Sequence, residues 1–198
     1  AGQGTIALEI LEDIEETDMI IAPVGGGGLI SGIAAAAKML KPKIRIIGVQ
    51  AAACPSAHES FRKGRIVQAD FRPSIADGIS VRQTGELTFQ MIRQYVDDIV
   101  LVEEEQIASA IVMLLERKKV LAEGAGAAPL AALFNQTVRV PAGGKVVLVV
   151  SGGNVDSPLL GRIISQGMIK NGRIMRFGVA LADSPGVLAR MLDLVAGL

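Results

Sequence analysis

The stretch M-I-I-A-P-V-G-G-G-G-L-I-S-G-I-A-A-A-A-K, residues 19–38, decides the fold of this chain. An apolar run of strand length, rich in Ile and Val, stops at four consecutive glycines, Gly25 to Gly28, and an alanine-rich segment follows. Branched residues favour a strand, glycines a turn and alanines a helix. The stretch therefore predicts a strand, a glycine turn and a helix in direct succession.

The four glycines predict a phosphate site. Each glycine loses more backbone entropy on folding than another residue would, so a run of four needs a compensating gain. A phosphate can supply it, because the backbone N–H groups reach it without hindrance from side chains and the following helix N-terminus adds partial positive charge. The structural alternative is a plain tight turn, which needs only one or two glycines.

Two common nucleotide-binding loops do not fit this stretch. A Walker loop requires Gly-Lys-Ser/Thr before its helix, but Leu29 and Ile30 follow the last glycine. If a dinucleotide fingerprint begins at Gly26, Ser31 stands where the third glycine belongs, and Gln50 stands where an acid would hold a ribose. We therefore expect a lone phosphate group and disfavour a nicotinamide-binding domain.

The composition is that of an ordinary globular protein. The 198 residues, half of them hydrophobic, suffice for a sizeable core without disulfides. Twenty basic and twenty acidic residues cancel, and no basic stripe indicates nucleic-acid binding. The single cysteine, Cys54, fits a reducing compartment, and neither a membrane span nor a signal peptide is visible, so we expect a cytoplasmic protein. The chain begins without Met and stops within a predicted helix, so we expect a fragment.

The rest of the pattern predicts an α/β fold built on a parallel sheet. Helices are expected at residues 5–16, from the glycine turn to about 40, at 84–95 and at 103–119, and further strands at 45–50, 98–102 and 145–150. Alternating strands and helices are typical of a parallel sheet, whose ligands lie at the carboxyl ends of its strands. The glycine turn and a second turn, S-G-G-N-V-D at residues 151–156, should therefore open on the same edge.

The pattern restarts near the C-terminus. After a helix that ends near Lys170, residues 173–182 alternate as in a strand, residues 183–186 form a turn, and residues 187–195 are amphipathic. One strand and one helix cannot bury their apolar faces alone. We therefore divide the chain into a first region, residues 1–170, and a linker with the start of another domain, residues 171–198.

Five segments resemble the threonine/serine dehydratases, fold-type II enzymes of pyridoxal 5′-phosphate (PLP) to which serine racemase is a near neighbour. The segments are G-Q-G-T-I-A-L-E (2–9), P-V-G-G-G-G-L-I-S-G (23–32), A-D-G-I (76–79), L-A-E-G-A-G (121–126) and S-G-G-N-V-D (151–156). The resemblance implies the large domain of the tryptophan synthase β-like fold. The segment R-F-G-V-A-L-A-D-S-P-G-V-L, residues 176–188, resembles the first strand and helix of an ACT domain, an amino-acid-sensing module, of which only the opening is present.

The resemblance also implies a set of cofactor-binding residues. The backbone N–H groups of five residues would hold the PLP phosphate: Gly25, Gly26, Gly27, Gly28 and Leu29. The Ser151 hydroxyl would face the pyridine nitrogen, and Gly78 and Glu123 would lie near the cofactor. A neutral hydroxyl cannot keep this nitrogen protonated as a carboxylate would, which favours prompt loss of a β-leaving group. The alternative for Ser151 is a turn hydroxyl that caps the next helix.

Other features of the family have no counterpart in this sequence. The Schiff-base lysine of the family belongs to an N-terminal S-x-K segment, and the eight lysines here lie in charged or helical-surface contexts: Lys38, Lys41, Lys43, Lys63, Lys118, Lys119, Lys145 and Lys170. We therefore expect no catalytic residue in this chain and no activity of the chain alone. Gln50 and Ser56 replace the acids that hold a metal in serine racemase-like members, so no metal site is expected. We interpret Cys54, His58 and Asp77 as structural residues.

The sequence thus leads us to expect the C-terminal part of a PLP-dependent threonine or serine ammonia-lyase, whose products are 2-oxobutanoate or pyruvate and ammonia. The expected partners are the amino-acid substrate, an amino-acid or nucleotide effector at the ACT domain, and further copies of the chain. The alternatives are serine racemase, another fold-type II lyase, and a non-catalytic module for another phosphate ligand. Ser151 argues against the last alternative, because a bare phosphate site needs no hydroxyl at the second turn.

Overall fold

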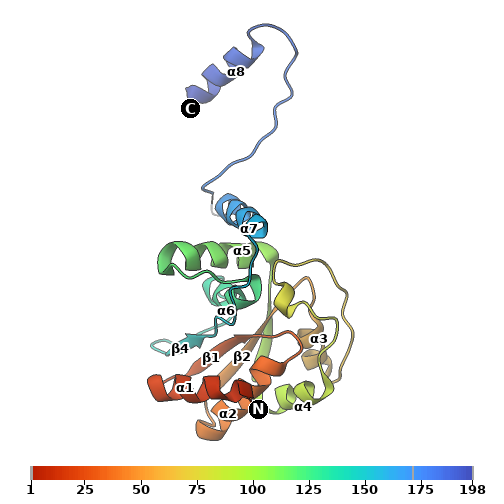
Figure 1. Ribbon diagram of the computed structural model, residues 1–198, viewed down its shortest axis with the longest axis vertical. Coiled ribbons are helices and arrows are strands. Elements are labelled where there is room, and N and C mark those ends of the chain that lie inside the picture. The colour runs from red at the N-terminus through yellow and green to blue at the C-terminus, as the bar shows by residue number, and fades with distance from the viewer. Residues whose placement is uncertain (1, 171, 198) are drawn as a thin grey trace.

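A parallel sheet of four strands forms the centre of the structure, a computed structural model that describes residues 2–170 and 172–197 (Figure 1). The strands are β1 (Met19–Pro23), β2 (Arg45–Ala51), β3 (Asp98–Val102) and β4 (Val146–Leu148), arranged in the order β3-β2-β1-β4. Met19 pairs with both Arg45 and Val146, so β1, β2 and β4 begin at the same level of the sheet. The carboxyl ends of β1 and β4 consequently meet at one edge, as the sequence predicts.

Helices cover both faces of the sheet (Figure 1). One face carries α1 (Thr5–Asp13), α2 (Gly28–Leu40), α3 (Ser56–Lys63) and α4 (Glu86–Tyr95), and the other carries α5 (Glu104–Met113), α6 (Gly124–Phe134) and α7 (Ser157–Lys170). The alternation of side chains along β1 supplies both cores, since Ile20 and Ala22 pack under the first set while Met19 and Ile21 pack under the second. Short turns of helix complete the body: η1 (Gly2–Gly4), η2 (Asp77–Ile79) and the π-helical η3 (Leu114–Lys118).

Small residues let helices approach the sheet closely. The run from Gly124 to Pro129 at the start of α6 is buried, as its small side chains require. On the other face, a Cβ atom at Gly48 of β2 would lie 2.6 Å from Val24 Cγ2 and 3.1 Å from Ile30 Cδ1. Gly48 thus allows the segment around the first glycine turn to pack directly on the sheet.

The observed elements differ from the expected ones mainly at their ends. Helix α1 ends at Asp13, three residues before the expected end, and α5 changes to the π-helical η3 at Leu114. The expected strand 145–150 forms ladder pairs with β1 over Val146–Leu148, and its backbone hydrogen bonds to β1 continue at Lys145 and Val149. None of the helices within the described residues combines the length and the apolar character that a membrane crossing requires.

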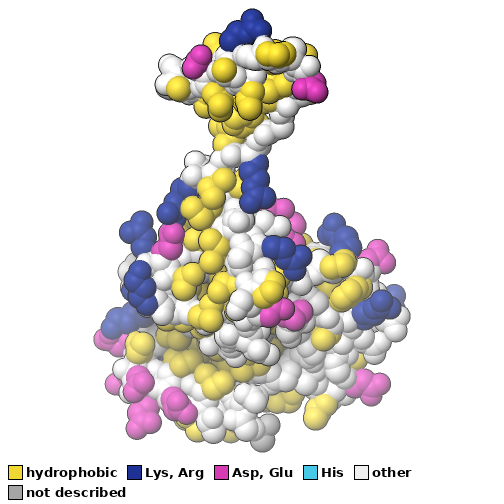
Figure 2. All heavy atoms as spheres, turned by 45° about the horizontal axis from the view of Figure 1, so that its top comes forward, with side chains coloured by type: hydrophobic (Ala, Val, Ile, Leu, Met, Phe, Trp, Pro, Cys, Tyr) yellow, Lys and Arg dark blue, Asp and Glu magenta, His cyan; other side chains and the backbone are white. Residues whose placement is uncertain are grey.

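The expected strand over residues 173–182 is wrong. This segment is extended but has no ladder partner among the described residues, and Met175 and Phe177 are 82% and 64% exposed. An alternating pattern can form a strand only where another strand accepts its backbone hydrogen bonds. Helix α8 (Val187–Ala196) forms as expected but buries none of its residues. Figure 2 shows the hydrophobic side chains that this C-terminal segment leaves on the surface.

Candidate functional site

A cavity of about 700 Å³ lies at the carboxyl edge of the sheet, where both glycine turns open. Its lining includes every residue for which the sequence predicts a contact with the cofactor: Gly25, Gly26, Gly27, Gly28, Leu29, Gly78, Glu123 and Ser151. Gln3, Ile6, Ala125 and Val149 complete its wall together with neighbouring residues. Segments more than one hundred residues apart in the sequence therefore meet at one site of the size that a small ligand needs.

Two of the four glycines in the first turn are required by the packing of the chain itself. Gly27 has a φ of 92°, in the left-handed region, and a Cβ atom there would lie 2.9 Å from side-chain atoms of Thr88 and Ile92. A Cβ atom at Gly25 would lie 3.1 Å from the Cα atom of Ile79. These contacts explain a glycine at positions 25 and 27 without any ligand.

The other two glycines, Gly26 and Gly28, have no such explanation. A Cβ atom at either position would meet no heavy atom within 4 Å, although both residues line the cavity. Neither has a positive φ. The chain therefore leaves open the space that two side chains would fill, which is what a ligand held by the backbone requires.

The backbone of this turn has hydrogen-bonding capacity to spare. Among the described residues, the N–H groups from Gly26 to Leu29 donate to no carbonyl and to no side chain. Helix α2 begins here with neither a side-chain cap nor an acidic residue in its first turn. Free N–H groups at the positive end of a helix favour an anion, and a phosphate fits both features.

The second glycine turn presents Ser151 to the same cavity. The alternative interpretation of Ser151, a cap for the next helix, is wrong, because Asp156 performs that role: its Oδ1 atom accepts a hydrogen bond from the Leu159 N–H at 2.8 Å. Among the described residues, the Ser151 hydroxyl has no hydrogen-bond partner. It is thus available to a ligand.

Glu123 fastens the second turn from two directions. Its backbone N–H donates to the Gly152 carbonyl at 3.0 Å, and its Oε2 atom accepts from the Asn154 N–H at 3.1 Å. A Cβ atom at Gly152 would lie 2.4 Å from Glu123 Oε1. The carboxylate therefore occupies the space beside Gly152 and fixes the course of the chain from Ser151 to Asn154.

Gly78 reaches the cavity through a segment that Glu104 holds in place. The Glu104 carboxylate accepts hydrogen bonds from the Ser74 hydroxyl at 2.6 Å and from the Ile75 N–H at 2.8 Å. Asp77 is a turn residue, as the sequence indicates, since its Oδ1 atom accepts from the Gly78 N–H at 2.8 Å. Sequence reasoning missed Glu104, and the only signal was its place in the first turn of a predicted helix.

The remaining polar candidates are engaged in structural contacts. Gln50 Oε1 accepts from the backbone N–H groups of Ala57 and His58 at 2.8 and 3.1 Å, and Gln50 Nε2 lies 3.3 Å from Ser56 Oγ. The Cys54 thiol contacts a backbone carbonyl, and burial raises its pKa. Within the described part of the chain, no three His, Cys, Asp or Glu side chains are grouped so that they could hold a metal ion, and the residues lining the cavity include no lysine.

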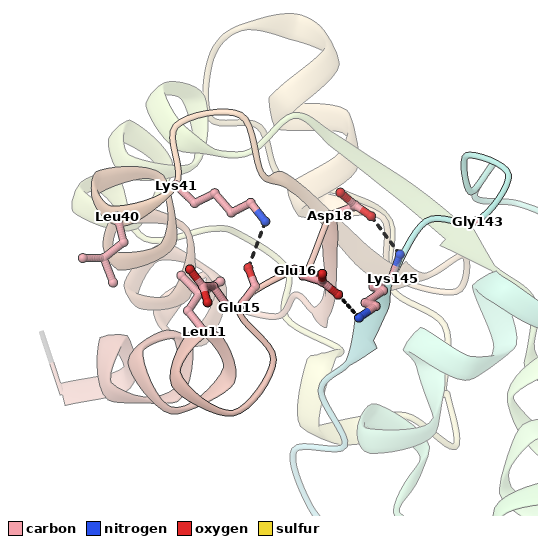
Figure 3. A pocket seen from close by; sticks show the side chains of 8 residues that line it. All are labelled: Leu11, Glu15, Glu16, Asp18, Leu40, Lys41, Gly143 and Lys145. Carbon is pink, nitrogen blue, oxygen red and sulfur yellow. Dashed lines mark hydrogen bonds and ion pairs between the residues drawn. The ribbon is translucent and has the colours of Figure 1, made fainter.

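A second pocket, of about 880 Å³, lies at the opposite edge of the sheet (Figure 3). Several of its charged side chains already have partners: Lys145 pairs with Glu16, Asp18 accepts from the Lys145 backbone N–H, and Lys41 donates to the backbone carbonyl of Glu15 at 3.0 Å. These contacts join the segment before β1 to the start of β4. We therefore assign this pocket a structural role and place the candidate site at the carboxyl edge.

The fold and the glycine-lined cavity define a class of cofactor-dependent enzymes. The chain belongs to the family described as pyridoxal-phosphate dependent enzyme, whose model matches residues 1–152. Its parallel sheet is that of the fold-type II members. The residues present fit PLP: free N–H groups for its phosphate, and a hydroxyl for its ring nitrogen.

Individual relatives narrow the comparison. An L-threonine ammonia-lyase of Geobacter sulfurreducens is 52% identical over 196 residues, which cover 99% of this chain and 48% of that protein. Among solved structures, a T.th. threonine deaminase matches with a TM-score of 0.74 and 39% identity, over 78% of this chain and 58% of that one. Maize serine racemase matches with a TM-score of 0.76 and 37% identity, over 86% and 53%. The chain spans about half the length of the curated relatives it matches.

Proposed function

We propose that this chain is part of a PLP-dependent ammonia-lyase that converts threonine or serine into the corresponding 2-oxo acid and ammonia. The observation that carries the proposal is the pair Gly26 and Gly28, which leave open the space beside free N–H groups at the start of α2. The likeness to the Geobacter relative, an L-threonine ammonia-lyase, supports the choice of reaction. Bound PLP supplies an electron sink that assists loss of the α-proton and of the β-hydroxyl.

Each side of the cavity has its own part in this proposal. The N–H groups from Gly25 to Leu29 bind the phosphate and orient the cofactor. The Ser151 hydroxyl meets the pyridine nitrogen as a neutral partner, so that the nitrogen is not forced to stay protonated. Gly78 and Glu123 lie beside the cofactor on the remaining side of the cavity. None of the described residues that line the cavity is a lysine, and we propose that the group that removes the α-proton belongs to another segment of the protein.

The most direct test measures ligand binding by the chain itself. Titration with pyridoxine 5′-phosphate and with pyridoxine should give a phosphate-dependent affinity, with inorganic phosphate as a competitor. Ser151→Ala should weaken both vitamers by about threefold to tenfold, the loss of one hydrogen bond, while the affinity for inorganic phosphate stays the same. Absence of any preference for the phosphorylated form would contradict the proposal.

A second candidate reaction is racemisation of serine, which the likeness to maize serine racemase favours. The two reactions differ in product. We expect the protein that contains this chain to release a 2-oxo acid and ammonia from L-threonine. Accumulation of D-serine from L-serine, without a 2-oxo acid, would support the second candidate instead.

The C-terminal part of the chain suggests how such an enzyme is regulated. We propose that residues 171–198 are a linker and the beginning of an ACT domain, and that an amino acid or nucleotide bound between two paired ACT domains shifts the activity. The exposed apolar side chains of Met175, Phe177 and helix α8 support this division, because they need a partner to be buried. A cytoplasmic location is proposed from the free, buried thiol of Cys54. An enzyme indifferent to amino acids and nucleotides would contradict the regulatory part.

A further inference from the structure

The side chains of Thr88 and Ile92 bring helix α4 against the first glycine turn, and the Thr88 side chain forms a hydrogen bond with it. The Thr88 hydroxyl lies 2.6 Å from the Gly26 carbonyl oxygen, which also accepts from the Gly85 N–H at 3.3 Å. A second link joins the same two elements, since the Ser31 hydroxyl of α2 donates to the Thr88 carbonyl at 3.2 Å. The glycine turn is therefore fastened to α4 at its carbonyl side.

The Thr88 hydroxyl donates its hydrogen bond to the Gly26 carbonyl. The hydroxyl also lies 3.0 Å from the Gly85 carbonyl, but it has only one proton to donate, and the Gly26 oxygen is closer. The Gly85 carbonyl already accepts from the Phe89 N–H at 2.9 Å. Without the Thr88 hydroxyl, the Gly26 carbonyl would keep only its long bond to Gly85.

This bond fixes the direction of an N–H group that has no partner among the described residues. The Gly26 carbonyl and the Gly27 N–H belong to one peptide unit, which is trans, so they point in opposite directions. A carbonyl drawn toward α4 turns the Gly27 N–H away from α4. Between two glycines such a unit can rotate with little steric resistance, because neither residue has a Cβ atom to oppose it.

We propose that Thr88 is a positioning residue, which locks the Gly26–Gly27 peptide so that the Gly27 N–H stays available to the ligand phosphate. The inference rests on the proposed function, in which the first glycine turn binds that phosphate. Thr88 itself is not among the residues that line the cavity. Its contribution is to prevent the carbonyl from turning toward a phosphate that it would repel.

The test compares three variants of the full chain on helix α4. Thr88→Val keeps the shape and removes the hydroxyl, Thr88→Ser keeps the hydroxyl, and Leu87→Ala changes a neighbouring side chain that is 72% exposed. Thr88→Val should lower the affinity for pyridoxine 5′-phosphate on the order of tenfold, the loss of one hydrogen bond to a charged group, and leave the affinity for pyridoxine unchanged. Thr88→Ser and Leu87→Ala should retain the parent ratio of the two affinities.

Urea unfolding separates this role from a merely structural one, which would lower the unfolding midpoint of Thr88→Val and leave the affinity ratio unchanged. That result would overturn the proposal. Equal losses in Thr88→Val and Thr88→Ser would overturn it too, because the hydroxyl would then be irrelevant.

A measurement without ligand keeps the two proposals distinguishable. With glycine-selective ¹⁵N labelling, the amide resonances of the first turn should shift in Thr88→Val and not in Thr88→Ser. If the parent chain shows no preference for the phosphorylated vitamer, the proposed function fails, and these resonances alone decide whether Thr88 orients the turn. Unchanged resonances in Thr88→Val would overturn the inference.

Discussion

The two glycine turns border the same cavity, yet the chain holds them in different ways. The first turn follows β1, whose residues are all buried, and leads directly into α2. The second follows the half-buried edge strand β4, and five residues separate Ser151 from the start of α7. Both turns are closely packed, but only the first contains a left-handed glycine, Gly27, whereas the second depends on its hydrogen bonds with Glu123. An alanine at Gly27 should therefore meet both backbone strain and a steric clash, while the second turn should be sensitive to the loss of the Glu123 carboxylate.

The largest expected effect is that of Gly27→Ala in the first turn. The substitution combines a φ of 92° with a Cβ atom 2.9 Å from Ile92 and Thr88, so it should lower the free energy of unfolding by about 3 kcal/mol. Urea unfolding of the chain measures this loss.

Gly26→Ala is the matched control, because its Cβ atom meets no heavy atom within 4 Å. It should change the free energy of unfolding by less than about 0.5 kcal/mol and still abolish binding of pyridoxine 5′-phosphate. Equal losses of stability at positions 26 and 27 would contradict the conclusion that packing requires a glycine at position 27 but not at position 26.

A smaller effect is expected from Glu123→Ala in the second turn. The substitution removes the acceptor of the Asn154 N–H, which should cost about 1 kcal/mol of unfolding free energy. If pyridoxine contacts Ser151 as proposed, the substitution should also weaken its binding, while the affinity for inorganic phosphate remains that of the parent chain.

Two controls accompany this variant. Glu123→Gln keeps an oxygen acceptor and should retain most of the stability, and Glu105→Ala removes an exposed acid elsewhere on the surface. If Glu123→Ala weakens the binding of inorganic phosphate as much as it weakens the binding of pyridoxine, the two turns are not held independently.

The smallest expected effect concerns the ion pair of Glu16 and Lys145, which lies at the edge of the sheet opposite the two turns. Its hydrogen bond and the charge of Lys145 lower the pKa of Glu16 from 4.5. A lowered folded-state pKa contributes stability above the ordinary value, and this contribution is lost as the pH falls below 4.5. Because both side chains are exposed, the contribution is small.

The urea midpoint of Glu16→Gln should therefore lie slightly below that of the parent near neutral pH, and the difference should vanish in acid. Glu15→Gln, which removes a neighbouring charge without an ion pair among the described residues, is the control. A difference that grows as the pH falls would have the wrong sign for this pair.

The sequence predicted the first turn better than the second for a physical reason. A buried strand, a glycine run and an alanine-rich helix are each visible in neighbouring letters, so β1 and α2 were expected almost to the residue. The strand before Ser151 was expected over six residues but forms ladder pairs over three, because the extent of pairing depends on the distant strand β1 and not on neighbouring letters. The strand at residues 173–182 failed for the same reason.

Contacts between distant residues were beyond sequence reasoning. The two glycine turns in the sequence predicted part of the cavity lining, and the family resemblance added Gly78 and Glu123. Thr88 and Glu104, which hold that lining from behind, lie in ordinary amphipathic helices, 62 residues from Gly26 in the case of Thr88. A single polar side chain in a helix has no periodicity that distinguishes it from a solvated one.

Because Gly48 has no side chain, it determines how closely the first glycine turn approaches the sheet. Val24, which precedes the first glycine, and Ile30 of α2 both rest where a Cβ atom of residue 48 would stand. Any larger residue there would raise the entire strand-to-helix connection from the sheet by roughly the thickness of a methyl group. The height of the first glycine turn relative to Ser151, in the turn that follows the neighbouring strand β4, thus depends on a residue of a third strand that lies outside the cavity.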